Sequence, residues 1–326
     1  MLDTSGSTGN PKGAVITHAN LAAFVSWALP AFNLGPNDRL LSHAPLQFDL
    51  SFFDIFASAA GSATFNVSTA VAFVASAAGA KVLKSGSAAY NSSCGSLDVL
   101  RALEIPMPED EAMLADMVCE FGIGFIPASR YTVLLRRMAA IVLPLAFRDV
   151  AGFVNTVGPL LCPYQVSVQM IGVSRFEHLD VFSDAVIRLA CAKTLLVQAE
   201  IGMDELCSIG DNHCRLIDGG VQSFTLSAER LGFSGGAASQ LAGGDVTLNA
   251  VILREILTGR RKGAARDTVV LNSGALLFVA GITPSIEAGI QRCAEAIDDG
   301  KAFGQLERLI EWGRKARGRH ASVPAH

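Results

Sequence analysis

The stretch from Thr64 to Asp98 constrains the fold more than any other part of the sequence. It begins with the polar turn Asn66-Val67-Ser68-Thr69, continues as an apolar run from Ala70 to Ala80, and ends in a loop rich in Gly and Ser. We expect a hydroxyl of the turn to cap a helix over the apolar run and Ala80–Leu83 to form a buried strand. Helix N-termini and Gly-rich loops both present backbone N–H groups, so the stretch predicts two phosphate-binding sites.

By composition alone, Gly and Ser could simply fill two turns, and the motifs decide between these alternatives. The segments TFNVST (64–69) and KSGSAAYNSSCGSLDVLRAL (84–103) resemble the core of the anthranilate phosphoribosyltransferase family. Similar motifs follow in order at Gly122–Phe125, Asn155–Leu160 and Gly202–Glu205, so the resemblance covers about residues 64–312. It implies an α/β domain of the nucleoside-phosphorylase and phosphoribosyltransferase type with a helical C-terminal part.

The resemblance also assigns site residues by position. Binding of phosphoribosyl pyrophosphate (PRPP) is expected at Asn66, Ser68, Thr69, Lys84, Gly86, Ser92 and Ser96. Mg²⁺ is the expected cofactor, with Ser68, Asp204 and Glu205 as its ligands. Paired carboxylates after a strand also suit Mg²⁺ by their chemistry, because this cation prefers oxygen ligands. Without the motif order, an exposed acidic turn would be the simpler interpretation.

The acceptor side departs from the family's pattern. Ser85 and Ser87 stand where the family has His and Asn, and Thr132 stands at its His-Pro motif. These three residues are the candidate acceptor-side positions. The changes remove groups suited to a planar carboxylate. The family's Gly-rich loop before the TFN motif is also absent, since residues 56–63 read FASAAGSA. These differences predict either a different acceptor or a loss of activity.

Residues 1–63 carry an unrelated motif. TSGSTGNPKG resembles the phosphate loop of the AMP-binding, adenylate-forming superfamily, and the resemblance continues to Phe56. The later motifs of that superfamily do not follow, and about sixty residues cannot rebuild its sheet. We therefore interpret this small segment as a fusion remnant or a helical cap, with a vestigial phosphate loop at Thr4, Ser5, Gly6, Ser7, Thr8, Gly9 and Lys12. The predicted domains are residues 1–63, a truncated AMP-binding-like segment, and 64–326, a glycosyltransferase domain.

Downstream patterns predict the rest of the fold. Strands at Ser167–Val173 and Thr194–Gln198 flank an amphipathic helix at Leu179–Cys191, and this alternation indicates an α/β sheet. Four helices are expected at Val246–Leu257, Ala265–Ala280, Pro284–Asp298 and Ala302–Arg317, with stops at Gly259, Gly281 and Gly300. Asn249 and Asn272 lie on apolar helices and are expected to be hydrogen-bonded core residues.

Bulk properties exclude several classes of function. The net charge is −4 and no basic stripe occurs, which argues against a nucleic-acid partner. No apolar run is long enough to span a membrane. The seven cysteines have no regular spacing, as expected for reduced thiols in a cytoplasmic protein. Cys207, His213 and Cys214 do not match a usual zinc spacing.

The sequence therefore predicts a Mg²⁺-dependent transfer of phosphoribose from PRPP to an aromatic amine or related small-molecule acceptor. A homodimer is compatible with this prediction. One alternative is a non-catalytic fusion product or degenerate relative. Another is a pyrimidine-nucleoside phosphorylase-like activity, because those enzymes share the architecture.

Overall fold

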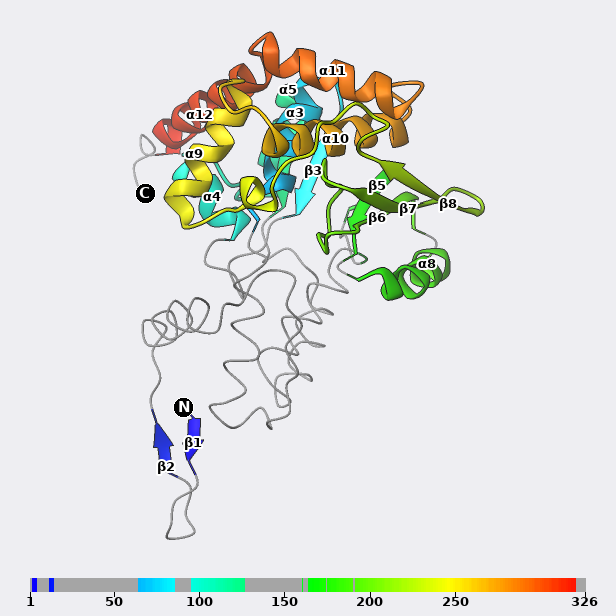
Figure 1. The fold of residues 1–326 in the computed structure, drawn as a ribbon. Coiled ribbons are helices and arrows are strands. Elements are labelled where there is room, and N and C mark those ends of the chain that lie inside the picture. The colour runs from blue at the N-terminus through cyan, green and yellow to red at the C-terminus, as the bar shows by residue number, and fades with distance from the viewer. Residues whose placement is uncertain are drawn as a thin grey trace. The chain divides into compact units, whose positions relative to one another are not determined.

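The computed structural model describes residues 2–4, 12–14, 64–85, 95–126, 160, 164–173, 175–189 and 191–320. The chain divides into two compact units, Met1–Ala63 and Thr64–His326. In the first unit, the described residues form an antiparallel hairpin of β1 (Leu2–Thr4) and β2 (Lys12–Ala14). The second unit contains helices, a two-stranded sheet and a four-stranded sheet (Figure 1).

Helix α3 (Val67–Ala77) forms the core of the second unit. It packs against α10, α11, α12 and α9, and nine of its eleven residues are buried. Because helices pack around it, α3 is apolar on nearly all faces. Its small side chains allow these neighbours to approach closely. The helix begins earlier than predicted. Asn66 is the N-cap, its side chain makes no capping hydrogen bond, and Ser68 and Thr69 lie inside the first turn, so the predicted hydroxyl cap is wrong.

A two-residue turn follows α3 and shifts the next strand. Ala80 N donates to Ala75 O (3.0 Å), and Val82 N is the first amide that pairs with the neighbouring strand, at Gly122 O (2.8 Å). Strand β3 therefore runs Val82–Ser85, where we had predicted a buried strand at Ala80–Leu83. It is half-buried and pairs in parallel with β4 (Ile123–Ile126). Helices α4 (Ser96–Ala102) and α5 (Glu111–Phe121) connect the two strands.

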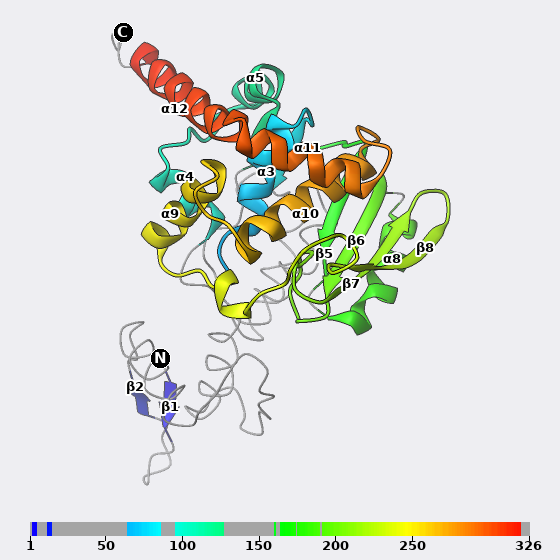
Figure 2. The same ribbon diagram turned by 45° about the horizontal axis from the view of Figure 1, so that its top comes forward.

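The larger sheet has the order β5-β6-β7-β8. Its strands are β5 (Val168–Gly172), β6 (Lys193–Ala199), β7 (Asp211–Ile217) and β8 (Val221–Ser227). β5 and β6 are parallel and are joined through η3 (Phe176–His178) and α8 (Leu179–Arg188), as the alternation predicted. β7 and β8 form an antiparallel hairpin that the sequence analysis missed. α8 packs on one face of the sheet and α10 on the other (Figure 2).

Four helices complete the unit after the short η4 (Ala238–Leu241). They are α9 (Val246–Leu257), α10 (Ala264–Val279), α11 (Ile286–Asp298) and α12 (Lys301–His320). Gly259, Gly281 and Gly300 adopt left-handed φ values of 70°, 71° and 74° after the first three, which confirms the predicted stops. The predicted start of α11 at Pro284 is wrong. Ser285 is the N-cap, its hydroxyl accepts from Ala288 N (3.2 Å), and Pro284 therefore precedes the helix.

Among the described residues, no helix is both long enough and apolar enough to span a membrane.

Candidate functional site

The segment that leads into α3 is held by the loop before α9. Phe65 N donates to Leu241 O (3.1 Å), and Gly243 packs so closely that a Cβ there would lie 2.8 Å from Phe65 N. Asn249 secures this loop by accepting from Gly244 N (3.0 Å) and donating to Gly244 O (3.1 Å). Asn249 is thus a hydrogen-bonded core residue, as predicted, and the contact fixes the start of α3.

The two predicted hydroxyls at the start of α3 lie in different environments. Ser68 is exposed. Thr69 is fully buried, and its Oγ1 has no hydrogen-bond partner among the described residues. An unpaired buried hydroxyl costs about 1–3 kcal/mol. The N-terminal turn of α3 therefore offers one accessible hydroxyl and one buried hydroxyl that lacks a partner.

Lys84 lies within β3, although the predicted strand Ala80–Leu83 ended one residue before it. Its Nζ donates to Ser85 O (2.9 Å). Burial lowers the pKa of Lys84 to about 8, and the negative charge of Glu205 partly offsets this effect. Lys84 and Glu205 therefore interact electrostatically although they are far apart in sequence. Ser85, at the end of β3, is exposed.

The carboxylate pair Asp204 and Glu205 follows β6 after a tight turn. Gly202 N donates to Ala199 O (2.8 Å) and Ala199 N to Met203 O (3.0 Å), and the positive φ of Gly202 (90°) lets the chain reverse. Asp204 is exposed, whereas Glu205 is half-buried, with an Oε2 that has no hydrogen-bond partner within the described part of the chain. The pair thus follows its strand and turn, as predicted from the sequence.

Burial shapes the charge state of this pair. The pKa of Glu205 is raised well above its usual range, first by burial and then by the charge and hydrogen bond of Asp204, while Lys84 acts in the opposite direction. A carboxylate destabilised in this way gains most from a nearby cation. The loop therefore presents two oxygen donors whose mutual repulsion a metal ion would relieve.

Gly172, the last residue of β5, packs directly against the backbone of Asp204. A Cβ at this position would lie only 1.6 Å from Asp204 O and 2.7 Å from Asp204 C. Only a glycine allows this approach of backbone to backbone. Gly172 was not predicted as a site residue, because no local sequence pattern distinguishes a glycine required by a distant loop from a glycine at an ordinary strand end.

The side chains of Asp204 and Glu205, the predicted metal ligands at this loop, offer oxygen atoms only. Across the described ranges, no group of three or more His, Cys, Asp or Glu side chains could hold a metal ion. Mg²⁺ commonly needs only one or two carboxylates, because it retains waters and shares the oxygens of a bound phosphate. Asp204 and the orphaned Oε2 of Glu205 fit that pattern. His213 packs edge-to-face against Phe176, with ring centroids 4.7 Å apart.

The remaining predicted residues are only partly described. Ser96 is the first residue of α4, where it is buried. Thr4 in β1 pairs with Lys12 in β2 at the base of the predicted vestigial loop. The others lie outside the described residues: Gly86, Ser87, Ser92, Thr132 and the loop residues Ser5, Gly6, Ser7, Thr8 and Gly9.

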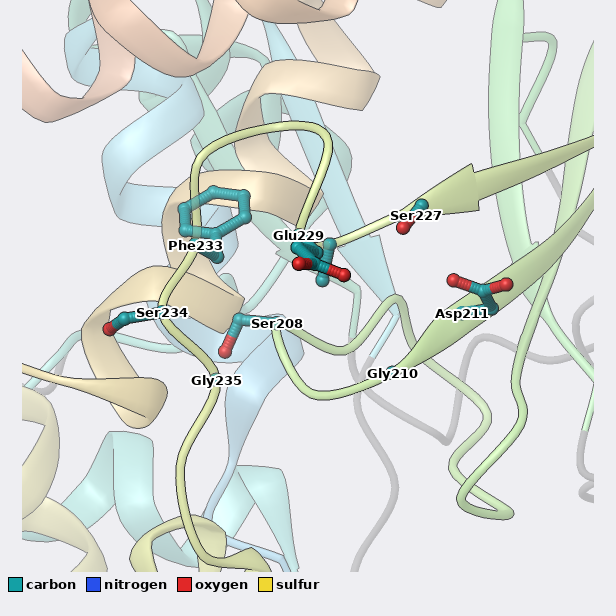
Figure 3. Close-up of a pocket in the computed structure, with 9 residues that line it drawn as sticks. Ser208, Gly210, Asp211, Ser227, Glu229, Phe233, Ser234 and Gly235 are labelled. Atoms are coloured by element: carbon teal, nitrogen blue, oxygen red, sulfur yellow. The ribbon is translucent and has the colours of Figure 1, made fainter.

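A pocket of about 390 Å³ lies near the carboxylate loop, but it contains none of the predicted site residues. Figure 3 shows it between the loop at Ser208 and Gly210, the adjoining ends of β7 and β8, and the turn carrying Glu229 and Phe233. Ser208 connects it to the carboxylate loop, three residues after Glu205. The pocket is therefore distinct from the predicted site residues Lys84, Asp204 and Glu205, none of which lines it.

Comparison with known proteins identifies the family. Residues 58–303 match the family described as "Glycosyl transferase family, a/b domain". Anthranilate phosphoribosyltransferase of Rubrobacter xylanophilus is 38% identical over 259 residues, which cover 79% of this chain and 75% of that protein. The enzyme of the same name from Clostridium beijerinckii is 36% identical over 250 residues, covering 76% and 73%. The chain belongs to the glycosyl transferase family of the anthranilate phosphoribosyltransferases.

Solved structures agree with this assignment. The crystal structure of anthranilate phosphoribosyltransferase from Thermus thermophilus has a TM-score of 0.70 and 28% identity, covering 92% of this chain and 97% of that one. The Saccharomyces cerevisiae enzyme in complex with PRPP and Mg has a TM-score of 0.66, 22% identity and coverage of 92% and 99%, and so supports the fold alone. These comparisons confirm three predictions: the family, the fold class and the assignment of the chain to the pentosyltransferases.

The N-terminal resemblance is also confirmed. Residues 2–85 match the family described as "AMP-binding enzyme". This match overlaps the glycosyl transferase match between residues 58 and 85, a range that includes α3 and β3.

Proposed function

We propose that this chain transfers the phosphoribosyl group of PRPP to an aromatic amine, with release of pyrophosphate. The observation that carries the proposal is the convergence of Lys84, on β3, with Glu205, on the loop after β6. A cation and a carboxylate pair brought together between two sheets suit a substrate that carries both phosphates and a metal ion. The relatives named above are anthranilate phosphoribosyltransferases, which makes anthranilate the first acceptor to test.

The phosphate side is proposed to use the N-terminal turn of α3 and the end of β3. Backbone amides at a helix N-terminus favour anions, and Asn66, Ser68 and Thr69 occupy that turn. The unpaired Oγ1 of Thr69 would gain a partner from a bound ligand. Lys84 would neutralise phosphate charge. Gly86, Ser92 and Ser96 are proposed to complete the phosphate contacts.

Asp204, Glu205 and Ser68 are proposed to hold Mg²⁺. When bound, Mg²⁺ would offset the negative charge that builds on the departing pyrophosphate. Because Glu205 is partly buried and its pKa is raised, it must lose a proton to act as a ligand, and ion binding supplies the driving force for that loss.

The protein's own contribution to the reaction is positioning. The bond between the ribose carbon and the pyrophosphate oxygen breaks, a carbon–nitrogen bond forms, and the amine gives up one proton. Lys84 and the helix N-terminus hold the leaving group, so the acceptor can be aligned with the ribose carbon. No strong general base is required for an aromatic amine, whose proton becomes acidic once the new bond forms.

The acceptor side is proposed to differ from that of the relatives. Ser85, Ser87 and Thr132 replace the imidazole and amide groups expected there, and Ser85 is exposed at the end of β3. Hydroxyls bind a planar carboxylate less strongly than charged or bidentate groups do. We therefore expect a preference that includes aromatic amines lacking the ortho-carboxylate of anthranilate.

The experiment is a binding and turnover assay on the full chain. PRPP binding is measured calorimetrically with and without Mg²⁺, and pyrophosphate release is then followed with anthranilate and other aromatic amines. Asp204→Asn should weaken the Mg²⁺-dependent part of binding, and Lys12→Ala should leave it unchanged. If PRPP and pyrophosphate both fail to bind at millimolar concentration, the chain is a non-catalytic relative. Cleavage of uridine by phosphate, without PRPP activity, would instead support the phosphorylase alternative.

A further inference from the structure

The three residues that follow the carboxylate pair donate their backbone amides to buried side chains. These bonds run from Leu206 N to Asn272 Oδ1 (3.0 Å), from Cys207 N to Asn212 Oδ1 (2.6 Å), and from Ser208 N to Thr268 Oγ1 (3.1 Å). The segment belongs to no helix or strand, so its amides lack the partners that regular structure would supply. Asn212, five residues after Cys207, provides one partner, and Thr268 and Asn272, 60 and 66 residues away from the amides they bind, provide the other two.

The two asparagines also bind the carbonyl groups of the same segment. Asn272 Nδ2 donates to Leu206 O (2.6 Å), and Asn212 Nδ2 donates to Cys207 O (2.9 Å). Each asparagine therefore pairs with both polar groups of one residue, as a neighbouring strand would. The side chains of Asn212, Thr268 and Asn272 are fully buried, so water does not compete for these bonds.

The clamping side chains come from two different elements, a strand and a helix. Asn212 lies on β7, whereas Thr268 and Asn272 lie one turn apart on α10. The hydroxyl of Thr268 is also 3.0 Å from Ser208 Oγ. Gly172, on β5, also packs against Asp204 O at the start of the same loop. The loop is thus fixed to both the sheet and the helix that covers it.

We propose that Asn212, Thr268 and Asn272 are positioning residues that hold the carboxylates of Asp204 and Glu205 in the arrangement that binds Mg²⁺. The role rests on the proposed function, because it assigns Mg²⁺ to that pair. Partners that orient metal ligands influence the metal affinity without touching the ion. Glu205 precedes the first clamped amide directly, so loosening the clamp frees both its backbone and its side chain.

The test uses a matched pair at Thr268 in the full chain. Thr268→Val keeps the shape of the side chain but removes the oxygen that accepts from Ser208 N, whereas Thr268→Ser keeps the oxygen. A third variant, Leu277→Ala, weakens the core elsewhere on α10, where Leu277 is fully buried. Two quantities are measured for each variant: the Mg²⁺ concentration that half-saturates PRPP binding, and the amide hydrogen exchange of peptides spanning residues 203–209.

We expect Thr268→Val to raise the half-saturating Mg²⁺ concentration by about 10-fold to 100-fold and to accelerate exchange in residues 203–209. Thr268→Ser should keep the Mg²⁺ concentration and the exchange rate of the unmodified chain. Leu277→Ala should lower the melting temperature without changing either quantity. If Thr268→Val accelerates exchange but leaves Mg²⁺ binding like that of Leu277→Ala, the clamp is only structural and the proposal is overturned. If the unmodified chain shows no Mg²⁺-dependent PRPP binding, the proposed function itself fails, and the positioning role with it.

Discussion

Replacing Gly172 by alanine should displace the carboxylate pair without altering any charged or polar group. The added Cβ would lie 1.6 Å from Asp204 O, whereas real Cβ contacts essentially never fall below 3.0 Å. The two atoms of Asp204 nearest to the new Cβ, its O and C, belong to the backbone, so no side-chain rotation can relieve the overlap. Asp204 O or the end of β5 must therefore move by at least about 1.4 Å, the difference between those two distances.

A displacement of this size has two expected consequences. A misplacement of about 1 Å at a reacting centre can lower the rate about 100-fold, which corresponds to about 2.7 kcal/mol of lost transition-state stabilisation. Overpacking also lowers the free energy of unfolding by about 1–3 kcal/mol. We therefore expect Gly172→Ala to fold with a reduced melting temperature and to lose at least about 100-fold in kcat/KM for PRPP.

The assay follows pyrophosphate release at a temperature at which circular dichroism shows the variant to be folded. Gly220→Ala is the matched control, because Gly220 lies in the β7–β8 turn with open space around its Cβ position and no positive φ. It should behave like the unmodified chain. A Gly172→Ala variant with kcat/KM within about threefold of the control would refute the reasoning, since the loop would then tolerate the displacement.

Three further predictions concern packing, pH and thiol reactivity. Gly289→Ala should lower the melting temperature by overpacking α10 against α11, because its Cβ would lie 2.3 Å from Gly274 O; a cost of about 1–3 kcal/mol is expected in thermal unfolding, with the PRPP affinity of the folded protein unchanged. PRPP affinity should fall as the pH rises through about 8, because Lys84, whose pKa is lowered to about 8 by burial, then loses its positive charge; Lys84→Arg should flatten that dependence in calorimetric titrations. Burial raises the pKa of Cys214 to about 12, so mass spectrometry after iodoacetamide treatment at neutral pH should find exposed Cys119 alkylated and Cys214 intact.

Local signals predicted much of the second unit. The C-terminal helices end at glycines that adopt left-handed φ, and this preference depends only on the absence of a Cβ. The β5–α8–β6 alternation was predicted because each element has its own hydrophobic period. Errors occurred at the starts of α3 and α11, where neighbouring polar residues compete to cap the helix. Sequence alone ranks such competitors poorly.

The β7–β8 hairpin was missed although Asp218-Gly219-Gly220 is a recognisable turn signal. Apolar and polar residues do not clearly alternate along its two strands. β7 is covered by α8 on one face and by apolar core residues on the other, whereas much of β8 is exposed. Which face of a strand is buried depends on the helices that pack on it. That information is absent from the strand's own residues.

The candidate site shows the same division. The sequence by itself determined the family, the Asn66–Thr69 turn and the Asp204–Glu205 pair, because each is a run of adjacent residues whose chemistry is readable in order. Only the tertiary structure decided that Lys84 interacts electrostatically with Glu205, that Gly172 packs against the backbone of Asp204, and that Thr268 and Asn272 bind the segment after the pair. These contacts join residues far apart in sequence, and no local propensity encodes which distant backbone a buried side chain will meet.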